Sequence, residues 1–224
     1  MFDREPVRSL VRAVHSRNMQ SIIFSFICAT LIQIICSASD LPGKANDTFF
    51  YFAYGSNLLA KRLLLRNPSA VFYSTARLDG HRLDFNQISE TWNGAVATIV
   101  EDEDEDVVGI LWTLNMDQQH LLDEQEGVEL GWYFPKNVTV TTPYGKKVVA
   151  RTYEEVEETP KIDKGTLRPP DRTPSSTYLE VILLGAIEAG LPPDYIAFLI
   201  SFPTNGRMAH IEIRRQLGYP FHVM

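Results

Sequence analysis

A glutamate beside a glycine, at the end of a predicted helix, is the residue of this chain best suited to acid–base chemistry. Glu126 follows the run 121–125 and precedes Gly127 and Val128. A carboxylate that is partly removed from water at a helix end has a raised pKa, which makes it a stronger general base near neutral pH. Glycine is also an ordinary helix C-cap, so Glu126 alone does not establish a catalytic site.

The second candidate for chemistry is a Gly-Ser-Asn turn that could bind an anion. The aromatic run 50–54 has the residues that a half-buried strand prefers. Gly55 then permits positive φ or the close approach of another group, and Ser56 and Asn57 can cap the helix that follows. Backbone N–H groups at such a strand-to-helix turn suit a carboxylate. A well-built turn without any ligand explains the same residues equally well.

The sequence contains none of the common catalytic or cofactor motifs. It has no Gly-x-Ser-x-Gly elbow, phosphate loop, dinucleotide fingerprint or His-Glu-x-x-His pair. No histidine or lysine is placed locally to activate Ser56 as a nucleophile. The five histidines lack ligand spacing, and the acidic run 101–106 lacks the glycine and the spaced ligands of a calcium loop. We therefore expect no metal and no cofactor.

Composition indicates one globular domain with appendages. The chain has 224 residues, of which 45% are hydrophobic and 22% charged, as is ordinary for a soluble globular protein. Its net charge of −7 argues against a nucleic-acid partner, which requires a basic face. The only two cysteines, Cys28 and Cys36, lie in one apolar N-terminal run, so the rest of the chain has no disulfide framework and no thiolate metal site.

The N-terminal segment 1–39 reads as a targeting sequence. Residues 20–39 carry no charge, and their apolar part, 22–36, has about the length of a signal-peptide core. Arginines precede this part, and small residues follow it, as a signal-peptidase site requires. We therefore expect cleavage near 38–40 and a secreted protein. Two alternatives remain open: the run could anchor the protein in a membrane, or Met19 could be the true start of a cytoplasmic protein.

The remaining chain alternates between strand and helix patterns. The expected strands are 50–54, 71–78, 81–85, 94–100, 107–114, 137–142 and 147–153. The expected helices are 57–65, 117–125, 178–189 and 193–200.

Turn signals complete this prediction. The pair Asp79-Gly80 predicts a hairpin between the strands on either side of it, and the acidic run 101–106 predicts the tip of a second hairpin. Pro143-Tyr144-Gly145 predicts a third. The polar, proline-containing segment 154–176 is expected to be a loop or lid. These elements indicate a linker over 40–49, one α+β domain over 50–205 and a C-terminal tail over 206–224.

Several ordered motifs together resemble the γ-glutamylcyclotransferase family. The Tyr-Gly-Ser-Asn turn at 54–57 is followed some distance on by Leu-Asp-Glu-Gln-Glu-Gly-Val at 122–128. The resemblance continues through 131–133, 150–153 and 184–192, and it covers roughly 50–199.

This resemblance implies a compact mixed β-barrel flanked by helices, often a homodimer, and a reaction that needs no cofactor. The implied enzyme is a lyase that converts a small γ-glutamyl amino acid to 5-oxoproline and a free amino acid. The substrate's own α-amine attacks its γ-carbonyl, and Glu126 is the implied general base. The implied substrate-binding residues are Tyr54, Gly55, Ser56, Asn57, Tyr133 and Tyr153.

The leaving group stays open. It could be an α-amino acid, the ε-amine of lysine in a γ-glutamylamine, or the Cys-Gly of glutathione, although the motif at 122–128 argues against the glutathione-specific subgroup. The loop 154–176 is longer than the family pattern, so it could alter substrate choice. A secreted protein would also lie outside intracellular glutathione metabolism. A non-catalytic γ-glutamyl-binding protein is a further alternative, which the presence of both Glu126 and the 54–57 turn opposes.

Overall fold

The computed structural model describes residues 47–163, 166–218 and 220–221. The predicted signal segment 1–39, with both cysteines, and residues 40–46 of the predicted linker lie outside this part. None of the helices in the described part combines the length and the apolar character that crossing a bilayer requires.

The core of the described unit is a closed five-stranded barrel. Its strands are β1 (Thr48–Ala53), β2 (Val71–Ser89), β3 (Gly94–Asn115), β4 (Tyr133–Thr141) and β5 (Lys147–Glu155).

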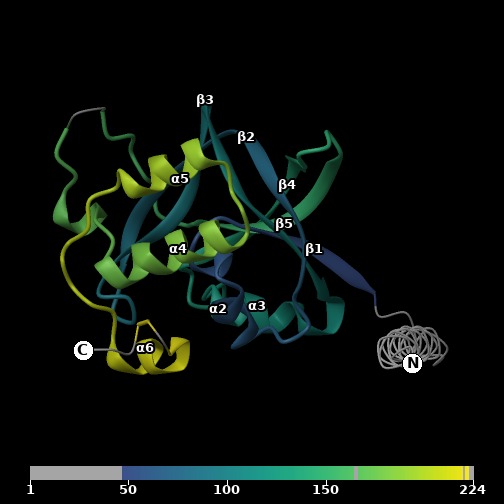
Figure 1. Cartoon of the computed structure of the whole chain (residues 1–224), viewed down its shortest axis with the longest axis horizontal. Coiled ribbons are helices and arrows are strands. Elements are labelled where there is room, and N and C mark those ends of the chain that lie inside the picture. Colours follow the sequence, from purple (N-terminus) through teal and green to yellow (C-terminus); the bar gives the residue numbers. More distant parts are fainter. Residues whose placement is uncertain (1–46, 164–165, 219, 222–224) are drawn as a thin grey trace, which may run out of the picture. The chain divides into compact units, whose positions relative to one another are not determined.

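Strand order around the barrel is β1-β3-β2-β4-β5. Four of the contacts are antiparallel, and β1 meets β5 in parallel where Tyr51 lies opposite Arg151. Large apolar side chains fill the interior, with Phe52, Phe85 and Leu111 fully buried. The predicted α+β class and the mixed barrel flanked by helices are therefore confirmed (Figure 1).

Two of the predicted hairpins are wrong. Strands 71–78 and 81–85 do not pair with each other around Asp79-Gly80; they are consecutive parts of β2, and both pair with β3. The strand register shifts between Asp79 and His81, so Gly80, with a φ of 70°, lies at an irregularity within a long strand instead of at a reversal. A glycine with positive φ serves a bulge as well as a turn, which is why the dipeptide misled the prediction.

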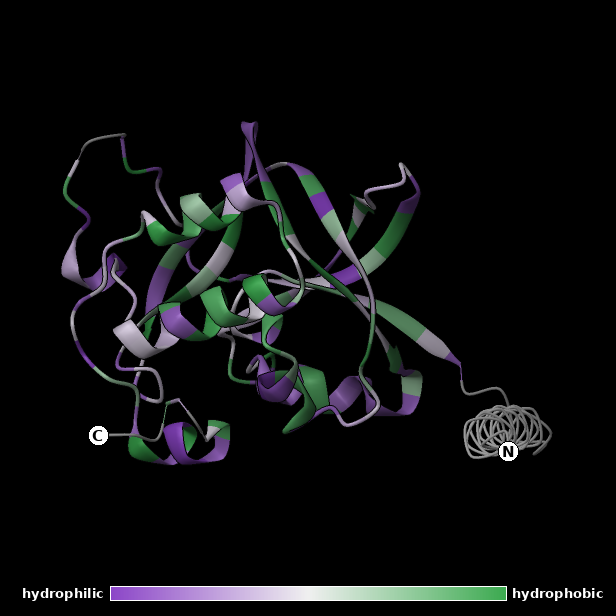
Figure 2. Ribbon diagram, viewed as in Figure 1, coloured by the Kyte–Doolittle hydropathy of each residue, from purple (hydrophilic) through white to green (hydrophobic). Residues whose placement is uncertain are grey.

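The acidic run lies in the middle of β3 and not at a hairpin tip. Asp106 is paired with Asp79, but the next pair joins Glu101 to His81, so the intervening acidic residues stand outside the ladder. Figure 2 shows this projecting part of the β2–β3 ribbon as hydrophilic. Ion pairs with neighbouring basic residues hold part of the run, including Asp102 with Lys161 at 2.6 Å.

The helices lie beside the barrel. They are α2 (Ala60–Leu64), α3 (Gln119–Gln125), α4 (Ser176–Glu188), α5 (Pro193–Ile200) and α6 (Ile211–Leu217), with 3-10 turns η1 (Ser56–Leu58), η2 (Met116–Gln118) and η3 (Pro170–Arg172).

Most of these helices agree with the prediction, and one is divided. The expected helix 57–65 becomes η1 and α2, because Leu59 between them has an extended backbone with φ −77° and ψ 112°. Leu59 is almost fully buried, so tertiary packing fixes it in a conformation that interrupts the helix. Helix α4 begins two residues before the predicted start at 178, with the Ser175 side chain accepting a hydrogen bond from the Tyr178 N–H.

The expected loop 154–176 is fastened to the barrel by buried charges. Asp84 of β2 is 2% exposed and pairs with Arg168 at 2.7 Å and with Arg172 at 2.8 Å. Burial raises the pKa of Asp84, but the hydrogen bonds and charges of the two arginines, with the Phe85 N–H, outweigh it and leave that pKa below its usual value. Two arginines of the loop therefore bind one buried carboxylate of the barrel, which fixes the loop in place.

The segment 206–224, expected as a tail, contains a docked helix. The Ala209 N–H donates to Thr177 Oγ1 on α4 at 3.1 Å, and the His210 N–H donates to the Thr91 carbonyl at 2.9 Å. Leu217 of α6 is fully buried. The packed structure therefore continues past residue 205. The apolar pattern of α6 is short, so the sequence did not predict this helix.

Candidate active site

The Gly-Ser-Asn turn lies where β1 ends, pressed against β3 and α4. A Cβ atom at Gly55 would lie 3.2 Å from Ala97 Cβ and 3.3 Å from the Tyr178 hydroxyl oxygen. The φ of Gly55 is −111°, so close approach, and not left-handed backbone, favours glycine here. The turn then enters η1, whose first N–H groups have no acceptor within the turn itself.

Helix α4 fixes this turn from behind. Gly185 of α4 is buried, and a Cβ atom there would lie 2.3 Å from the Leu58 carbonyl carbon and 2.3 Å from the Leu59 nitrogen. The helix therefore packs directly on the backbone that follows the turn. Only a residue without a side chain allows the helix to approach this backbone so closely. The position of the turn therefore depends on a glycine at 185, which is far from it in sequence.

Glu126 sits at the end of α3, where Gly127 closes the helix with a φ of 67°. Asn57 of η1 donates a hydrogen bond from Nδ2 to Glu126 Oε1 at 2.9 Å, and also to the Tyr51 hydroxyl at 2.9 Å. Gln125 in turn donates from Nε2 to Asn57 Oδ1 at 2.8 Å. The amide of Asn57 thus joins the turn to the carboxylate, which confirms that the two predicted elements meet.

Burial raises the pKa of Glu126 to about 7. The charge of Arg62 and hydrogen bonds from Asn57 and Tyr51 oppose this rise, while Asp123 adds to it. The balance leaves a carboxylate that exchanges a proton near neutral pH. This is the property that a general base at physiological pH requires.

Three tyrosines around the turn have their hydroxyls already engaged. Tyr54 donates to the Tyr153 carbonyl at 2.6 Å, and Tyr133 donates to the Ala97 carbonyl at 2.7 Å and lies 3.2 Å from Glu155 Oε1. The hydroxyl of Tyr153 donates to Asp123 Oδ1. Their rings therefore form the walls of the site, and their hydroxyls hold these walls in place.

The Tyr153 hydroxyl is also bound on its other side. Arg151 donates from Nε to the Tyr153 hydroxyl at 3.0 Å and from Nη2 to Asp123 Oδ1 at 2.7 Å. This triad joins β5 to α3 next to Glu126. Its contacts position the end of α3, and none of them runs to the Glu126 carboxylate itself.

Every site residue expected from sequence lines one small crevice of about 30 Å³. The crevice residues are Tyr51, Tyr54, Gly55, Ser56, Asn57, Ala97, Glu126, Tyr133, Tyr153 and Tyr178.

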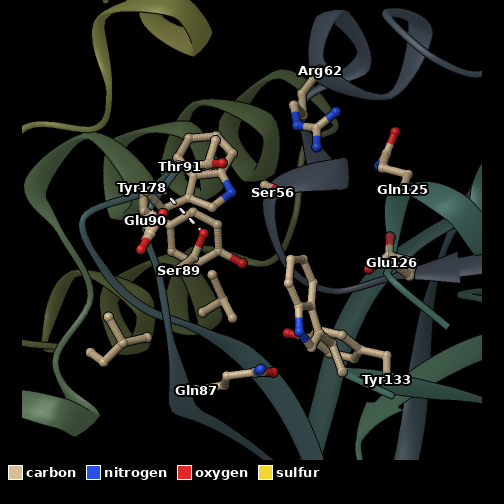
Figure 3. A pocket seen from close by; sticks show the side chains of 14 residues that line it. Ser56, Arg62, Gln87, Ser89, Glu90, Thr91, Gln125, Glu126, Tyr133 and Tyr178 are labelled. Carbon is tan, nitrogen blue, oxygen red and sulfur yellow. Dashed lines mark hydrogen bonds between the residues drawn. The ribbon is translucent and has the colours of Figure 1, made fainter. Parts of the chain in front are cut away.

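A larger cavity of about 430 Å³ adjoins this crevice. Ser56, Glu126, Tyr133 and Tyr178 line both spaces, so the two form one site. Figure 3 shows Glu126 on one side of the cavity, Tyr178 opposite, Tyr133 below and Arg62 above. A small polar molecule can therefore place one end in the crevice and the remainder in the cavity.

The sequence prediction missed Tyr51, Tyr178 and Arg62. Tyr51 lies on a strand whose inward face is apolar, and Tyr178 comes from α4, a helix distant in sequence. One signal could have found Arg62: it follows the buried Leu58 by four positions, which in a helix is the same face. A charged residue on an inward face deserves to be considered as a binding residue.

Within the described residues, no group of three or more histidine, cysteine, aspartate or glutamate side chains is arranged to hold a metal ion. The groups that the site offers are a carboxylate with a pKa near 7, backbone donors, an arginine and tyrosine rings. Such a set suits proton transfer on a small polar substrate.

Comparison with known proteins agrees with this description. The model of the AIG2-like family matches residues 106–199. The chain is 44% identical over 172 residues to a γ-glutamylcyclotransferase of Bos taurus, covering 74% of this chain and 85% of that protein. It is 41% identical over 162 residues to a γ-glutamylcyclotransferase of Homo sapiens, covering 70% and 79%. A solved γ-glutamyl cyclotransferase structure matches with a TM-score of 0.67 at 37% identity, covering 76% of this chain and 98% of that one.

Proposed function

This chain belongs to the γ-glutamylcyclotransferase family, and from that premise we propose how its site performs the reaction. The protein is an enzyme that converts γ-glutamyl amino acids to 5-oxoproline and a free amino acid. One observation carries the mechanism: Glu126, with a pKa of about 7, is held 2.9 Å from Asn57 of the turn and opens onto the cavity.

Glu126 acts as the general base in this mechanism. Its carboxylate takes a proton from the substrate α-ammonium, and the freed amine forms a bond to the γ-carbonyl carbon of the same molecule. The tetrahedral intermediate then breaks its original C–N bond, and the leaving nitrogen takes up the proton that Glu126 holds. The ring nitrogen loses its second proton, which passes through Glu126 to the same leaving nitrogen, so 5-oxoproline keeps one N–H and the amino acid leaves as an ammonium. No water is consumed, so atoms and charge balance. The nucleophile is already tethered, and closing a five-membered ring gives a large effective molarity.

The turn holds the γ-glutamyl end. Ser56 and Asn57 at the start of η1 line the crevice, and their backbone N–H groups are suited to the oxygen of the γ-carbonyl, on which negative charge develops. The side chain of Asn57 keeps Glu126 beside this point. In this scheme Ser56 contributes backbone rather than a nucleophilic hydroxyl, so its side chain matters less than that of Glu126.

Measurement of 5-oxoproline from γ-glutamyl-alanine, γ-glutamyl-ε-lysine and glutathione tests the proposal. We expect product from γ-glutamyl-alanine, and we expect Glu126→Gln to reduce kcat by a factor of at least about 10². Glu124→Gln is the matched control, because it makes the same chemical change at an exposed position of the same helix. Equal rates for wild type and Glu126→Gln would exclude Glu126 as the base. A γ-glutamyl ligand that binds without turnover would favour the non-catalytic alternative.

We also propose that the protein is secreted after removal of its N-terminal segment. An uncharged run with preceding arginines and following small residues supports this. The test is expression in a secreting cell, followed by N-terminal sequencing of protein from the medium, where we expect a first residue near 38–40. Retention of the whole chain in the membrane fraction would indicate an anchor, and a cytoplasmic product starting at Met19 would exclude secretion.

A homodimer is proposed on the family resemblance. Exposed apolar side chains at the start of β2, Val71, Phe72 and Tyr73, supply surface that a second copy could cover. Light scattering during gel filtration tests this proposal. A mass of one chain at all protein concentrations would contradict it.

A further inference from the structure

Arg62 lies in the wall of the large cavity without a carboxylate in direct contact among the described residues. Its Nε atom is buried and lacks a hydrogen-bond partner among the described residues, and none of the ion pairs in that part of the chain includes Arg62. Burying a guanidinium group without a directly hydrogen-bonded counter-charge is costly. Such a group next to a cavity is suited to an anion that arrives from solution.

Neighbouring residues hold the guanidinium in place. It lies over the ring of Trp92, with its central carbon 5.9 Å from the ring centroid. Figure 3 shows the Arg62 side chain directed from α2 into the cavity, between Ser56 and Gln125. Burial lowers the pKa of Arg62, and the nearby Glu126 carboxylate opposes that change. The two side chains are therefore close enough for their charges to interact.

The position of Arg62 relative to the crevice indicates which part of the substrate it contacts. Arg62 lines the large cavity but not the crevice of the 54–57 turn, whereas Glu126 lines both. If the γ-glutamyl end occupies the crevice, as proposed above, the portion beyond the scissile amide occupies the cavity.

We propose that Arg62 binds the carboxylate of the leaving amino acid, and so makes γ-glutamyl α-amino acids the preferred substrates over γ-glutamylamines. This inference rests on the proposed function. It also names a specificity-determining residue, because the guanidinium is the cationic group on the cavity wall that a planar carboxylate can bind through two N–H groups. The loop 154–176 is not needed for this discrimination.

Two substrates that differ only in the leaving carboxylate test the proposal. These are γ-glutamyl-alanine and γ-glutamyl-alaninamide, in which a neutral amide replaces the carboxylate. We expect wild type to prefer the acid in kcat/KM by about 10- to 100-fold, as for one lost charge-assisted contact. Arg62→Gln should remove this preference by raising KM for the acid, while turnover of the amide substrate persists. Arg62→Lys should retain part of the preference.

The ratio of the two kcat/KM values is the diagnostic quantity. Arg62 also lowers the pKa of Glu126, so its removal affects both substrates, but that effect cancels in the ratio. Measurement well above the Glu126 pKa makes it smaller still. The matched control is Arg66→Gln, which removes the same charge at an exposed position outside the large cavity and should leave the ratio unchanged.

Two results would overturn this inference. One is a wild-type enzyme that uses both substrates equally; the other is an Arg62→Gln variant that loses the same factor on both, as expected if Arg62 binds the α-carboxylate of the glutamyl portion or serves only the fold. Failure of the proposed function looks different, because wild type would then yield no 5-oxoproline from either substrate. If Arg62→Gln does not fold, the ratio measured with Arg62→Lys decides the question.

Discussion

At the scale of single residues, the site depends on one carboxylate whose protonation is balanced near neutrality. Burial acts against the charge of Glu126, and Asn57, Tyr51 and Arg62 act in its favour. Each of these groups therefore adjusts the fraction of the base that is unprotonated, even if it never touches the substrate. That balance gives two predictions, one kinetic and one thermodynamic.

The kinetic prediction concerns the hydrogen bond from Asn57. For wild type, kcat/KM for γ-glutamyl-alanine should rise with pH around a midpoint of about 7, because only the unprotonated carboxylate accepts the substrate proton. The bond from Asn57 lowers the Glu126 pKa, so Asn57→Ala should move this midpoint to higher pH. A pH–rate profile measures the shift separately from any loss in amplitude. An unchanged or lower midpoint would contradict the prediction.

The thermodynamic prediction concerns stability. The Glu126 pKa is about 7 in the folded protein against 4.5 as the ordinary value, so the folded state binds more protons in this interval and its stability falls as pH rises through it. Glu126→Gln removes the buried charge and with it this loss of stability at high pH. At about pH 8 the variant should be inactive yet more resistant to urea, by at most about 3 kcal/mol in free energy of unfolding.

A pH series supplies the control for this prediction. Well below pH 4.5 both states of the wild type carry a protonated Glu126, so the two proteins should be equally stable. Glu124→Gln, at an exposed position, should show no comparable difference at either end of the range. A Glu126→Gln variant that is less stable than wild type near pH 8 would show that the carboxylate stabilises the fold.

At the scale of elements, the site is assembled by packing between segments that are distant in sequence. Helix α4 holds η1 through Gly185, and the Asp123, Arg151 and Tyr153 triad holds the end of α3 against β5. The turn and the base therefore keep their distance only if both contacts are intact. Gly185 gives the sharper test, since its contact is with backbone.

Gly185→Ala should reverse the usual effect of this substitution. In a helix interior, glycine to alanine ordinarily stabilises by roughly 0.5–1 kcal/mol. Here the new Cβ would lie 2.3 Å from the Leu58 and Leu59 backbone, so we expect a loss of about 1–3 kcal/mol and a lower kcat/KM as the turn moves away from Glu126. Thermal unfolding and initial rates measure the two effects. Glu188→Ala, exposed on the same helix, is the control, and a stabilised Gly185→Ala would refute the argument.

At the scale of the whole described unit, the barrel is closed by long-range pairing, and the C-terminal segment is part of the packed structure. The β1–β5 contact joins segments about a hundred residues apart, at Tyr51 and Arg151. The C-terminal helix α6 contacts the Glu90–Asn93 turn region through His210 and Thr91, next to the cavity wall. Residues beyond 205 therefore contribute to the stability of the enzyme.

Leu217→Ala tests this contribution. Its side chain is fully buried, so truncation should lower the free energy of unfolding by about 2–5 kcal/mol, measured by urea denaturation. Gln216→Ala changes the neighbouring exposed residue of α6 and should have little effect. Equal stability for Leu217→Ala and wild type would mean that α6 is not firmly docked in solution.

Much of the molecule could be read from sequence because local chemistry dictates it. Helices α4 and α5 follow from apolar spacing and the Gly190 and proline signals, and the hairpin of β4 and β5 follows from alternation about Gly145. The barrel class and the pairing of Glu126 with the 54–57 turn came from a family resemblance, which carries tertiary information that spacing alone does not.

Tertiary structure alone decided the rest. Asp79-Gly80 reads locally as a turn, but β3 is long enough to pair with both sides of it, so the chain continues in the same strand through an irregularity. Leu59 interrupts a predicted helix because burial outweighs local propensity. The raised pKa of Glu126 and the unsatisfied Nε of Arg62 exist only when distant segments exclude water from them. Residue types determine which chemical groups are available. Desolvation, which depends on the whole fold, determines which of these groups become reactive.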